Sequence, residues 1–208
     1  MTPPPIRVLL VDDHFIIRMG LAGALARESD IQVVGEAATG SEALALFDRL
    51  LPDITLMDGM LPDMHGVEVV SRIIARHPSA RVIMVSINET PEDIHQAMEA
   101  GASGYLSKSC GKQITVNAIR SVAAGGVHLP PEIKSKLSER ASYASLGSRE
   151  IEVLRRIARG RANKEIAAEL NLSELTVKAH ISHILSKLGA PDRTRAVTLA
   201  LERGILRL

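Results

Sequence analysis

The 208-residue sequence predicts an α/β protein with a doubly wound, five-stranded parallel sheet, followed by a small all-α domain. Two observations lead to this fold class. From residue 6 to about residue 125, short β-rich runs alternate with helical stretches, whereas no strand signal remains after residue 146. Apolar runs without alternation, such as residues 8–11, are typical of parallel strands that helices cover on both faces.

Each element of the first domain follows from its hydrophobic period. In the second predicted helix, for example, one apolar face contains Ala43, Leu44, Phe47, Leu50 and Leu51. Right-handed crossovers between parallel strands then place helices on both faces of the sheet. The predicted strands are residues 6–11, 31–36, 54–57, 81–86 and 104–106, and the predicted helices are residues 14–27, 40–51, 66–76, 91–100 and 113–124.

The C-terminal part of the sequence predicts four helices. Ser148 and Asn163 are the predicted N-caps of the first two, and residues 171–173 form a tight turn. The third helix covers residues 174–188 and the fourth about residues 192–203. A helix, a three-residue turn and a second helix in this order predict a helix-turn-helix domain.

A polar stretch with glycine and proline separates the two halves. We expect one domain over residues 1–125, a linker with a short helix over 126–145, and the helical domain over 146–208. The net charge of +1 divides unevenly, because residues 1–125 carry a net charge of −5 and residues 145–208 one of +5. The helical domain is therefore basic enough to suggest nucleic acid as its partner.

Composition excludes several classes of protein. The single cysteine, Cys110, cannot build a disulfide framework and suits a reducing compartment. No apolar run approaches the ~20 residues of a membrane span, so we expect a cytoplasmic protein without membrane contact. With only two Phe, two Tyr and no Trp, the sequence disfavours proteins that stack single-stranded bases on aromatic side chains.

Polar side chains follow four of the predicted strands. Asp12 and Asp13 come after the first strand, Asp58 after the third, Ser86 ends the fourth, and Lys108 follows the fifth. Because parallel strands all end at the same edge, we expect these five side chains to meet there. Converging carboxylates need a cation, and hard oxygen ligands favour Mg²⁺, with Mn²⁺ as the substitute. A carboxylate beside a metal ion and an ammonium group is a suitable nucleophile for a phosphoryl group.

This half of the chain resembles the receiver domain of response regulators. The resemblance covers the first ~125 residues and is specific in combination. It rests on VDDH at 11–14, LMDGMLPDMHG at 56–66, Ser86 and GASGYLSK at 101–108. It implies a flavodoxin-like strand order of 2-1-3-4-5.

The resemblance also implies roles for individual residues. Asp58 would accept a phosphoryl group from a sensor histidine kinase, and Lys108 would pair with the phosphate. Asp13, Asp58 and the backbone carbonyl of Met60 would bind the metal ion, and Asp12 would act through water. We expect no enzymatic turnover beyond self-phosphorylation from a phosphodonor and self-dephosphorylation.

The expected switch residues in the receiver half are Ser86 and Tyr105. In the resembled family, the hydroxyl moves toward the phosphate and the aromatic ring turns inward. Two residues depart from the family pattern: Ser109 stands where many receivers have a cis-proline, and Gly59 replaces a branched residue after the acceptor. Gly59 is expected to loosen its loop, but neither departure removes a reacting group.

The third C-terminal helix has two distinct faces. Its narrow apolar face contains Val177, Ile181, Ile184 and Leu188. Small or basic residues lie on the opposite face, where they would allow close approach to a DNA groove, and these are Lys178, Ala179, Ser182 and Ser186. Lys164, Lys187, Arg161 and Arg193 are expected around this face for phosphate contacts.

The helical domain resembles LuxR-type DNA-binding domains over about residues 146–206. The matching segments are SREIEVL at 148–154, Gly160, NKEIA at 163–167 and SELTVKAH at 173–180. The resemblance implies that residues 174–188 enter the major groove of double-stranded DNA, with Lys178, Ala179 and Ser182 facing bases. Thr176, Lys164 and Lys187 complete the expected DNA-binding set. The last helix would form the dimer surface through Ala196, Val197, Ala200 and Leu201, on DNA half-sites of inverted symmetry.

A receiver followed by a LuxR-type domain is similar to the NarL/FixJ class of two-component response regulators. The expected protein is a transcription factor in which phosphorylation of Asp58 switches homodimer formation and DNA binding. One alternative keeps the DNA-binding domain but uses the receiver only for protein contacts, without phosphorylation. A second is a metal-dependent phosphohydrolase, in which the carboxylate cluster hydrolyses a bound phosphate ester.

Overall fold

The computed structural model describes residues 4–142 and 144–206. Two compact units divide this part of the chain: one comprises the residues up to Glu89 and Asp93–Ser135, and the other Thr90–Glu92 and the residues from Lys136 onward. No helix in the described ranges is long and apolar enough to cross a membrane.

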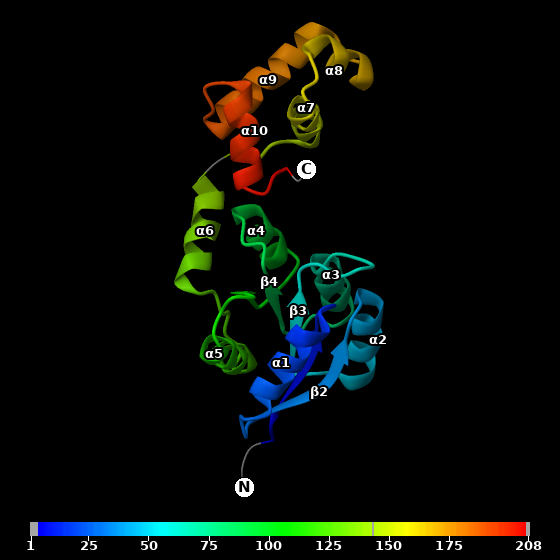
Figure 1. Ribbon diagram of the computed structural model, residues 1–208, viewed down its shortest axis with the longest axis vertical. Helices are drawn as coiled ribbons and strands as arrows, with labels where there is room; N and C mark the ends of the chain where they lie inside the picture. Colours follow the sequence, from blue (N-terminus) through cyan, green and yellow to red (C-terminus); the bar gives the residue numbers. More distant parts are fainter. Residues whose placement is uncertain (1–3, 143, 207–208) are drawn as a thin grey trace. The chain divides into compact units, whose positions relative to one another are not determined.

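The first unit contains a parallel sheet in the order β2-β1-β3-β4-β5, as the fold class predicts (Figure 1). Helices α1 and α5 pack on one face, where Leu25, Val116 and Ile119 join the core formed by β1, β3 and β4. Helices α2 and α3 pack against each other. The elements are β1 Ile6–Val11, α1 Phe15–Leu25, β2 Ile31–Ala37, α2 Gly40–Leu50, β3 Ile54–Asp58, α3 Gly66–Arg76, β4 Val82–Ser86, α4 Pro91–Glu99, β5 Gly104–Ser107 and α5 Lys112–Ala123.

Residue pairing aligns the ends of the central strands. Asp58, the last residue of β3, pairs with Val85 of β4, and Ser86 pairs with Ser107 of β5. The carboxyl ends of β3, β4 and β5 therefore form one edge of the sheet. The prediction for the end of the second helix was wrong at Leu51, which has φ 44° and is 57% exposed. The chain turns away there, so Leu51 caps the helix instead of packing in its apolar face.

The predicted linker contains more regular structure than a short helix. The backbone at His128 pairs with β5, since the Tyr105 N–H donates to the His128 carbonyl at 3.1 Å and the His128 N–H to that of Ser103 at 3.0 Å. Helix α6 follows over Pro131–Ser142.

The second unit is helical and is built around α9. Its elements are α7 Ser148–Ala158, α8 Asn163–Leu170, α9 Glu174–Leu188 and α10 Arg193–Glu202, and the other three helices all pack on α9 (Figure 1). Asn171, with φ 53°, ends α8, and Gly189, with φ 66°, ends α9. The left-handed backbone at Asn171 makes the tight turn of the helix-turn-helix.

The predicted N-caps of the first two C-terminal helices were wrong by one residue. Gly147 and Ala162 occupy the cap positions, and Ser148 and Asn163 begin the helices. The carboxylate of Glu150 accepts the Gly147 N–H at 2.7 Å, and Glu165 accepts the Ala162 N–H at the same distance. In both helices, a glutamate at the third helical position thus accepts the backbone N–H of the cap residue, which has no partner within the helix.

Candidate functional site

Three aspartates meet at the carboxyl edge of the sheet. Asp58 ends β3, whereas Asp12 and Asp13 directly follow β1. Ligand atoms from these carboxylates and from His14 all lie within 4.8 Å of one another. Asp12 and Asp58 are buried, and Asp13 and His14 are exposed, so the cluster is open to solvent on one side.

Lys108 joins the two buried carboxylates. Its Nζ lies 2.7 Å from Asp58 Oδ2 and 2.8 Å from Asp12 Oδ2, and its side chain is only 9% exposed. Burial disfavours the ammonium ion, but the hydrogen bonds with Asp12 and Asp58 outweigh it and raise the pKa of Lys108. Lys108 is therefore held in its charged form at the edge of the sheet.

The Asp58 carboxyl is destabilised as an anion. Burial is the main cause that raises the pKa of Asp58, and the neighbouring charge of Asp12 raises it further. The hydrogen bonds from Lys108 and from the Met60 N–H oppose this shift without cancelling it. An additional cation at the exposed side of the cluster would stabilise the ionised carboxylates.

The donor set of this pocket fits a hard divalent cation. Three carboxylates within 4.8 Å supply the oxygen ligands that such ions prefer, and His14 Nδ1 lies 2.6 Å from Asp13 Oδ1. The Met60 N–H lies 3.3 Å from Asp58 Oδ1, which places the backbone of Met60 next to the cluster. This cluster is thus suited to hold a divalent cation.

Ser86 and Tyr105 lie on neighbouring strands beside the pocket. Ser86 is buried, and its Oγ accepts the Asn88 N–H at 3.0 Å. The ring of Tyr105 is buried, and its hydroxyl donates to the Asn88 carbonyl. Both side chains therefore bond to the same residue after β4.

Gly59 serves a purpose other than the loosening expected from the sequence. A Cβ at this position would lie 2.9 Å from Ser86 Oγ and 3.3 Å from Ser86 Cβ. The missing side chain leaves room for the Ser86 hydroxyl.

Two residues that support the pocket were not singled out from the sequence. Asp63 accepts the N–H groups of Gly40 at 2.8 Å and Ser41 at 2.9 Å, and these bonds lower the pKa of Asp63 to about 2. Gly66 begins α3 where a Cβ would lie 1.9 Å from the Asp58 carbonyl oxygen. Both residues occur in the segment MLPDMHG at 60–66, and its closeness in sequence to Asp58 was the one feature that could have pointed to them.

In the second unit, the outward face of α9 carries the predicted base-facing residues. Lys178, Ala179 and Ser182 are all exposed, as are Thr176 in the first turn and Lys164 at the start of α8. The Thr176 N–H donates to Ser173 Oγ at 3.0 Å, which caps the helix. Within the described residues, neither Lys178 nor Lys164 forms an ion pair with a carboxylate.

Lys187, one of the predicted DNA contacts, forms an ion pair within the domain. Its Nζ lies 2.7 Å from Glu150 Oε2, in an ion pair between α9 and α7. Burial opposes ionisation of Glu150, but the bonds from Lys187 and from the Gly147 N–H hold the pKa of Glu150 below its usual value. The ion pair of Lys187 with Glu150 therefore joins α9 to α7.

The predicted dimer surface on α10 was wrong for two of its four residues. Ala196 and Ala200 are 1% and 0% exposed, because they pack in the core against the other helices of the unit. Val197 and Leu201 are partly buried at the margin of that core. The small side chains of the alanines allow α10 to approach the core closely, so they cannot face a second copy.

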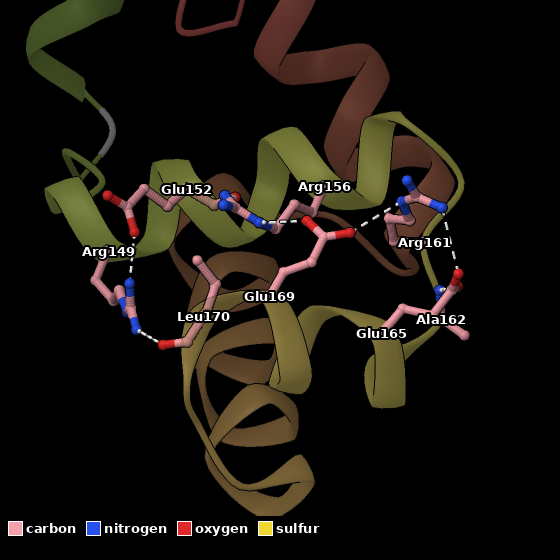
Figure 2. A network of polar contacts seen from close by, with 8 residues as sticks. All are labelled: Arg149, Glu152, Arg156, Arg161, Ala162, Glu165, Glu169 and Leu170. Atoms are coloured by element: carbon pink, nitrogen blue, oxygen red, sulfur yellow. Dashed lines mark hydrogen bonds and ion pairs between the residues drawn. The ribbon is translucent and has the colours of Figure 1, made fainter.

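Helices α7 and α8 are joined by a chain of charged side chains (Figure 2). Glu169 bridges Arg156 at 3.0 Å and Arg161 at 3.1 Å, and Arg161 also contacts Glu165 at 3.3 Å. At the other end of α7, Arg149 donates to the Leu170 carbonyl at 2.6 Å. Arg161, expected to contact DNA phosphates, is engaged here with two glutamates, and this network holds the first helix of the unit on the second.

Two family models match the chain. The model described as "Response regulator receiver domain" matches residues 8–120, and the one described as "Bacterial regulatory proteins, luxR family" matches residues 144–200. Fold, acidic pocket and helix-turn-helix thus define a receiver domain followed by a LuxR-type DNA-binding domain. The chain belongs to the two-component response regulators and is a DNA-binding regulator of transcription.

Individual relatives agree with this membership over the whole chain. The response regulator VraR of Staphylococcus aureus is 38% identical over 206 residues, which cover 97% of this chain and 99% of that protein. The response regulator ChrA of a heme-sensing two-component system is 35% identical with a TM-score of 0.57, over 98% of this chain and 100% of that one. RcsB of Salmonella enterica serovar Typhimurium, solved bound to a promoter, is 23% identical with a TM-score of 0.73 over 96% of this chain and 98% of that one, a likeness of fold alone.

Proposed function

We propose that Asp58 is the phosphoacceptor of this response regulator. The observation that carries the proposal is the position of Lys108, whose ammonium group lies 2.7 Å from the Asp58 carboxylate. During transfer, a carboxylate oxygen of Asp58 attacks the phosphorus while the bond from phosphorus to the donor breaks, and its electron pair stays on the histidine nitrogen of the kinase or on the acetate oxygen of acetyl phosphate. Lys108 offsets the negative charge that develops on the phosphoryl oxygens. We assign the receiver to residues 1–125, the linker to 126–145 and the DNA-binding domain to 146–208.

The metal site of this proposal comprises Asp12, Asp13 and Asp58, with the backbone carbonyl of Met60. Asp13 and Asp58 would bind Mg²⁺ or Mn²⁺ directly, and Asp12 would act through water. When bound, the ion supplies charge neutralisation for the phosphoryl group. The fit of the oxygen donors within 4.8 Å supports this assignment.

Ser86 and Tyr105 are the proposed switch residues. The Ser86 hydroxyl would bond the phosphoryl oxygens after leaving the Asn88 N–H, which it accepts at 3.0 Å without phosphate. Tyr105 is bonded to the same Asn88, so a movement of this backbone reaches both side chains. This shared partner supports coupling between the two residues.

A sensor histidine kinase is the proposed phosphodonor. Phe15, Ile16 and Met19 are 65%, 75% and 56% exposed at the start of α1, immediately after the acidic pair. Large apolar side chains grouped on a surface are typical of a protein contact. Their place beside the acceptor supports a protein donor.

The proposed DNA-binding residues are Lys178, Ala179 and Ser182 at the base edges, with Lys164 and Thr176 at phosphates. Their exposure to solvent supports this role. Phosphorylation is proposed to produce a homodimer on inverted half-sites, and sedimentation velocity with and without acetyl phosphate tests that step. Lys164→Ala should weaken DNA binding and reduce the slope of log affinity against log salt by about 1.

Acetyl phosphate with Mg²⁺, followed by mass spectrometry of the intact protein, tests the acceptor. One phosphoryl group should be added, and chelation of the metal ion should prevent it. Asp58→Ala should abolish the addition, whereas Asp48→Ala, which removes an exposed carboxylate of α2, should leave it unchanged. Labelling that persists in Asp58→Ala would refute the assignment, and an unlabelled wild-type protein would favour a receiver that acts without phosphorylation.

A further inference from the structure

Leu175 is a large apolar side chain on the surface of the DNA-binding domain. It is the second residue of α9 and is 78% exposed, more than any other large hydrophobic residue in the described chain. A single exposed leucine is ordinary on a protein surface. Its position on the helix therefore decides whether it has a role.

Leu175 lies at the centre of the outward face of α9. At about 100° per residue, Leu175, Ala179 and Ser182 fall within about 60° of one another on the side opposite the core. The buried residues on the core side include Val177 and Ile184. Leu175 thus shares its face with the residues proposed to meet base edges.

The chemistry of this face suits the floor of a DNA groove. Leu175 shares this exposed face with Lys178, Ala179, Ser182 and Ser186, whereas the exposed carboxylate of Glu174 lies about 100° away around the helix. The lysine supplies a cation beside the apolar side chain. The N-terminal residues of a recognition helix are those that contact base edges, and Leu175 lies in the first turn. A leucine cannot form a hydrogen bond with a base, so its partner must be apolar.

We propose that Leu175 determines DNA specificity by contacting the 5-methyl group of a thymine in the major groove. That methyl group is the apolar feature that distinguishes a T·A pair at this edge of the duplex. The proposal rests on the placement of α9 in the groove and adds a residue to the proposed base-reading set. It selects one T·A pair in each half-site.

The test uses the full-length protein, acetyl phosphate and Mg²⁺, and a random pool of duplex DNA from which bound sequences are selected. Each thymine of the selected site is then replaced by deoxyuridine, which removes only the methyl group. Loss of one buried methyl contact should weaken binding about fourfold at one position of each half-site. Leu175→Ala should bind the thymine and uracil versions of that position equally, whereas Leu175→Met, which keeps an apolar side chain of similar volume, should retain the difference.

The outcomes separate this proposal from the one it rests on. If no deoxyuridine weakens binding, or if Leu175→Ala keeps the full thymine preference, Leu175 does not read the methyl group although DNA binding stands. If the wild-type protein selects no sequence, the proposed role of α9 is wrong instead. Circular dichroism of Leu175→Ala checks that the helix is intact, which the exposure of the side chain leads us to expect.

Discussion

Alanine at Gly66 should disrupt the loop that holds the proposed acceptor. A Cβ there would lie 1.9 Å from the Asp58 carbonyl oxygen and 3.2 Å from Gly59 Cα. An ordinary C···O contact is about 3.3 Å, so the two backbone segments would have to separate by about 1.4 Å. Because backbone atoms cannot rotate away as a side chain can, we expect the cost to reach or exceed ~3 kcal/mol, the upper end for overpacking. That is a large fraction of the ~5–15 kcal/mol that stabilises a typical domain.

Native-state hydrogen exchange of the β3 amides, Ile54–Asp58, measures this loss in the full-length protein. These amides lie in the central strand of the sheet and report the free energy of opening the unit. Gly23→Ala is the matched control, because this position lies inside α1 and a methyl group added there would meet no atom within 4 Å apart from the neighbouring backbone of the helix itself. Alanine should stabilise that helix by about 0.5–1 kcal/mol.

The same pair of variants distinguishes local distortion from general destabilisation. Gly66→Ala should also reduce labelling by acetyl phosphate under conditions in which the protein stays folded, because the displaced carbonyl belongs to Asp58. Gly23→Ala should be labelled as the wild type. If exchange in β3 is unchanged in Gly66→Ala, the close backbone approach at Gly66 does not constrain the loop that follows Asp58.

Three further predictions concern charged groups. Asp63 should titrate near pH 2 in NMR spectra of the folded protein, because it accepts N–H groups at the start of α2. The stability that these bonds contribute is fully present above the unfolded pKa of 3.8 and is lost as the pH falls toward 2. Titration of Asp63 near pH 4 would contradict this prediction. In metal-free buffer, Asp58→Asn should raise the midpoint of urea unfolding, because it removes one of the two buried carboxylates that share Lys108. A lower midpoint would show that the ion pair of Asp58 with Lys108 outweighs the repulsion between Asp58 and Asp12. Lys187→Ala should cost about 1 kcal/mol in urea unfolding, since it leaves Glu150 without its ion-pair partner. It should leave the salt dependence of DNA binding unchanged, and a shallower slope would instead indicate a phosphate contact.

Much of the fold could be predicted because its signals are local or periodic. Non-alternating apolar runs such as residues 8–11 indicated buried parallel strands. The bounds of α9 follow from its apolar face, from Ser173 before it and from Gly189 after it. Carboxylates at strand ends were expected to meet because parallel strands share one direction. The distances of Lys108 to both Asp12 and Asp58 could not be predicted, since they depend on how three strands are aligned.

Errors arose where a pattern does not specify its partner. Ala196 and Ala200 form a stripe of small residues that is compatible with a dimer surface or a tightly packed core, and only the packing of α10 on α9 distinguishes them. Lys187 is one of several lysines near the recognition helix, and its pairing with Glu150 depends on where α7 lies. Gly59 suggested a loose loop because the neighbouring Ser86 side chain, 27 residues later in the chain, was not in view.

The sequence by itself determined the two-part organisation, the parallel sheet, the acidic cluster with its lysine and the helix-turn-helix, because residue type and period specify these directly. Tertiary structure decided which groups are available. It placed Gly66 against the Asp58 carbonyl, committed Lys187 to Glu150, buried Ala196 and Ala200, and left Leu175 exposed. The physical reason is that exposure and ion pairing depend on neighbours from distant segments, whose positions are set only when the helices and strands pack together.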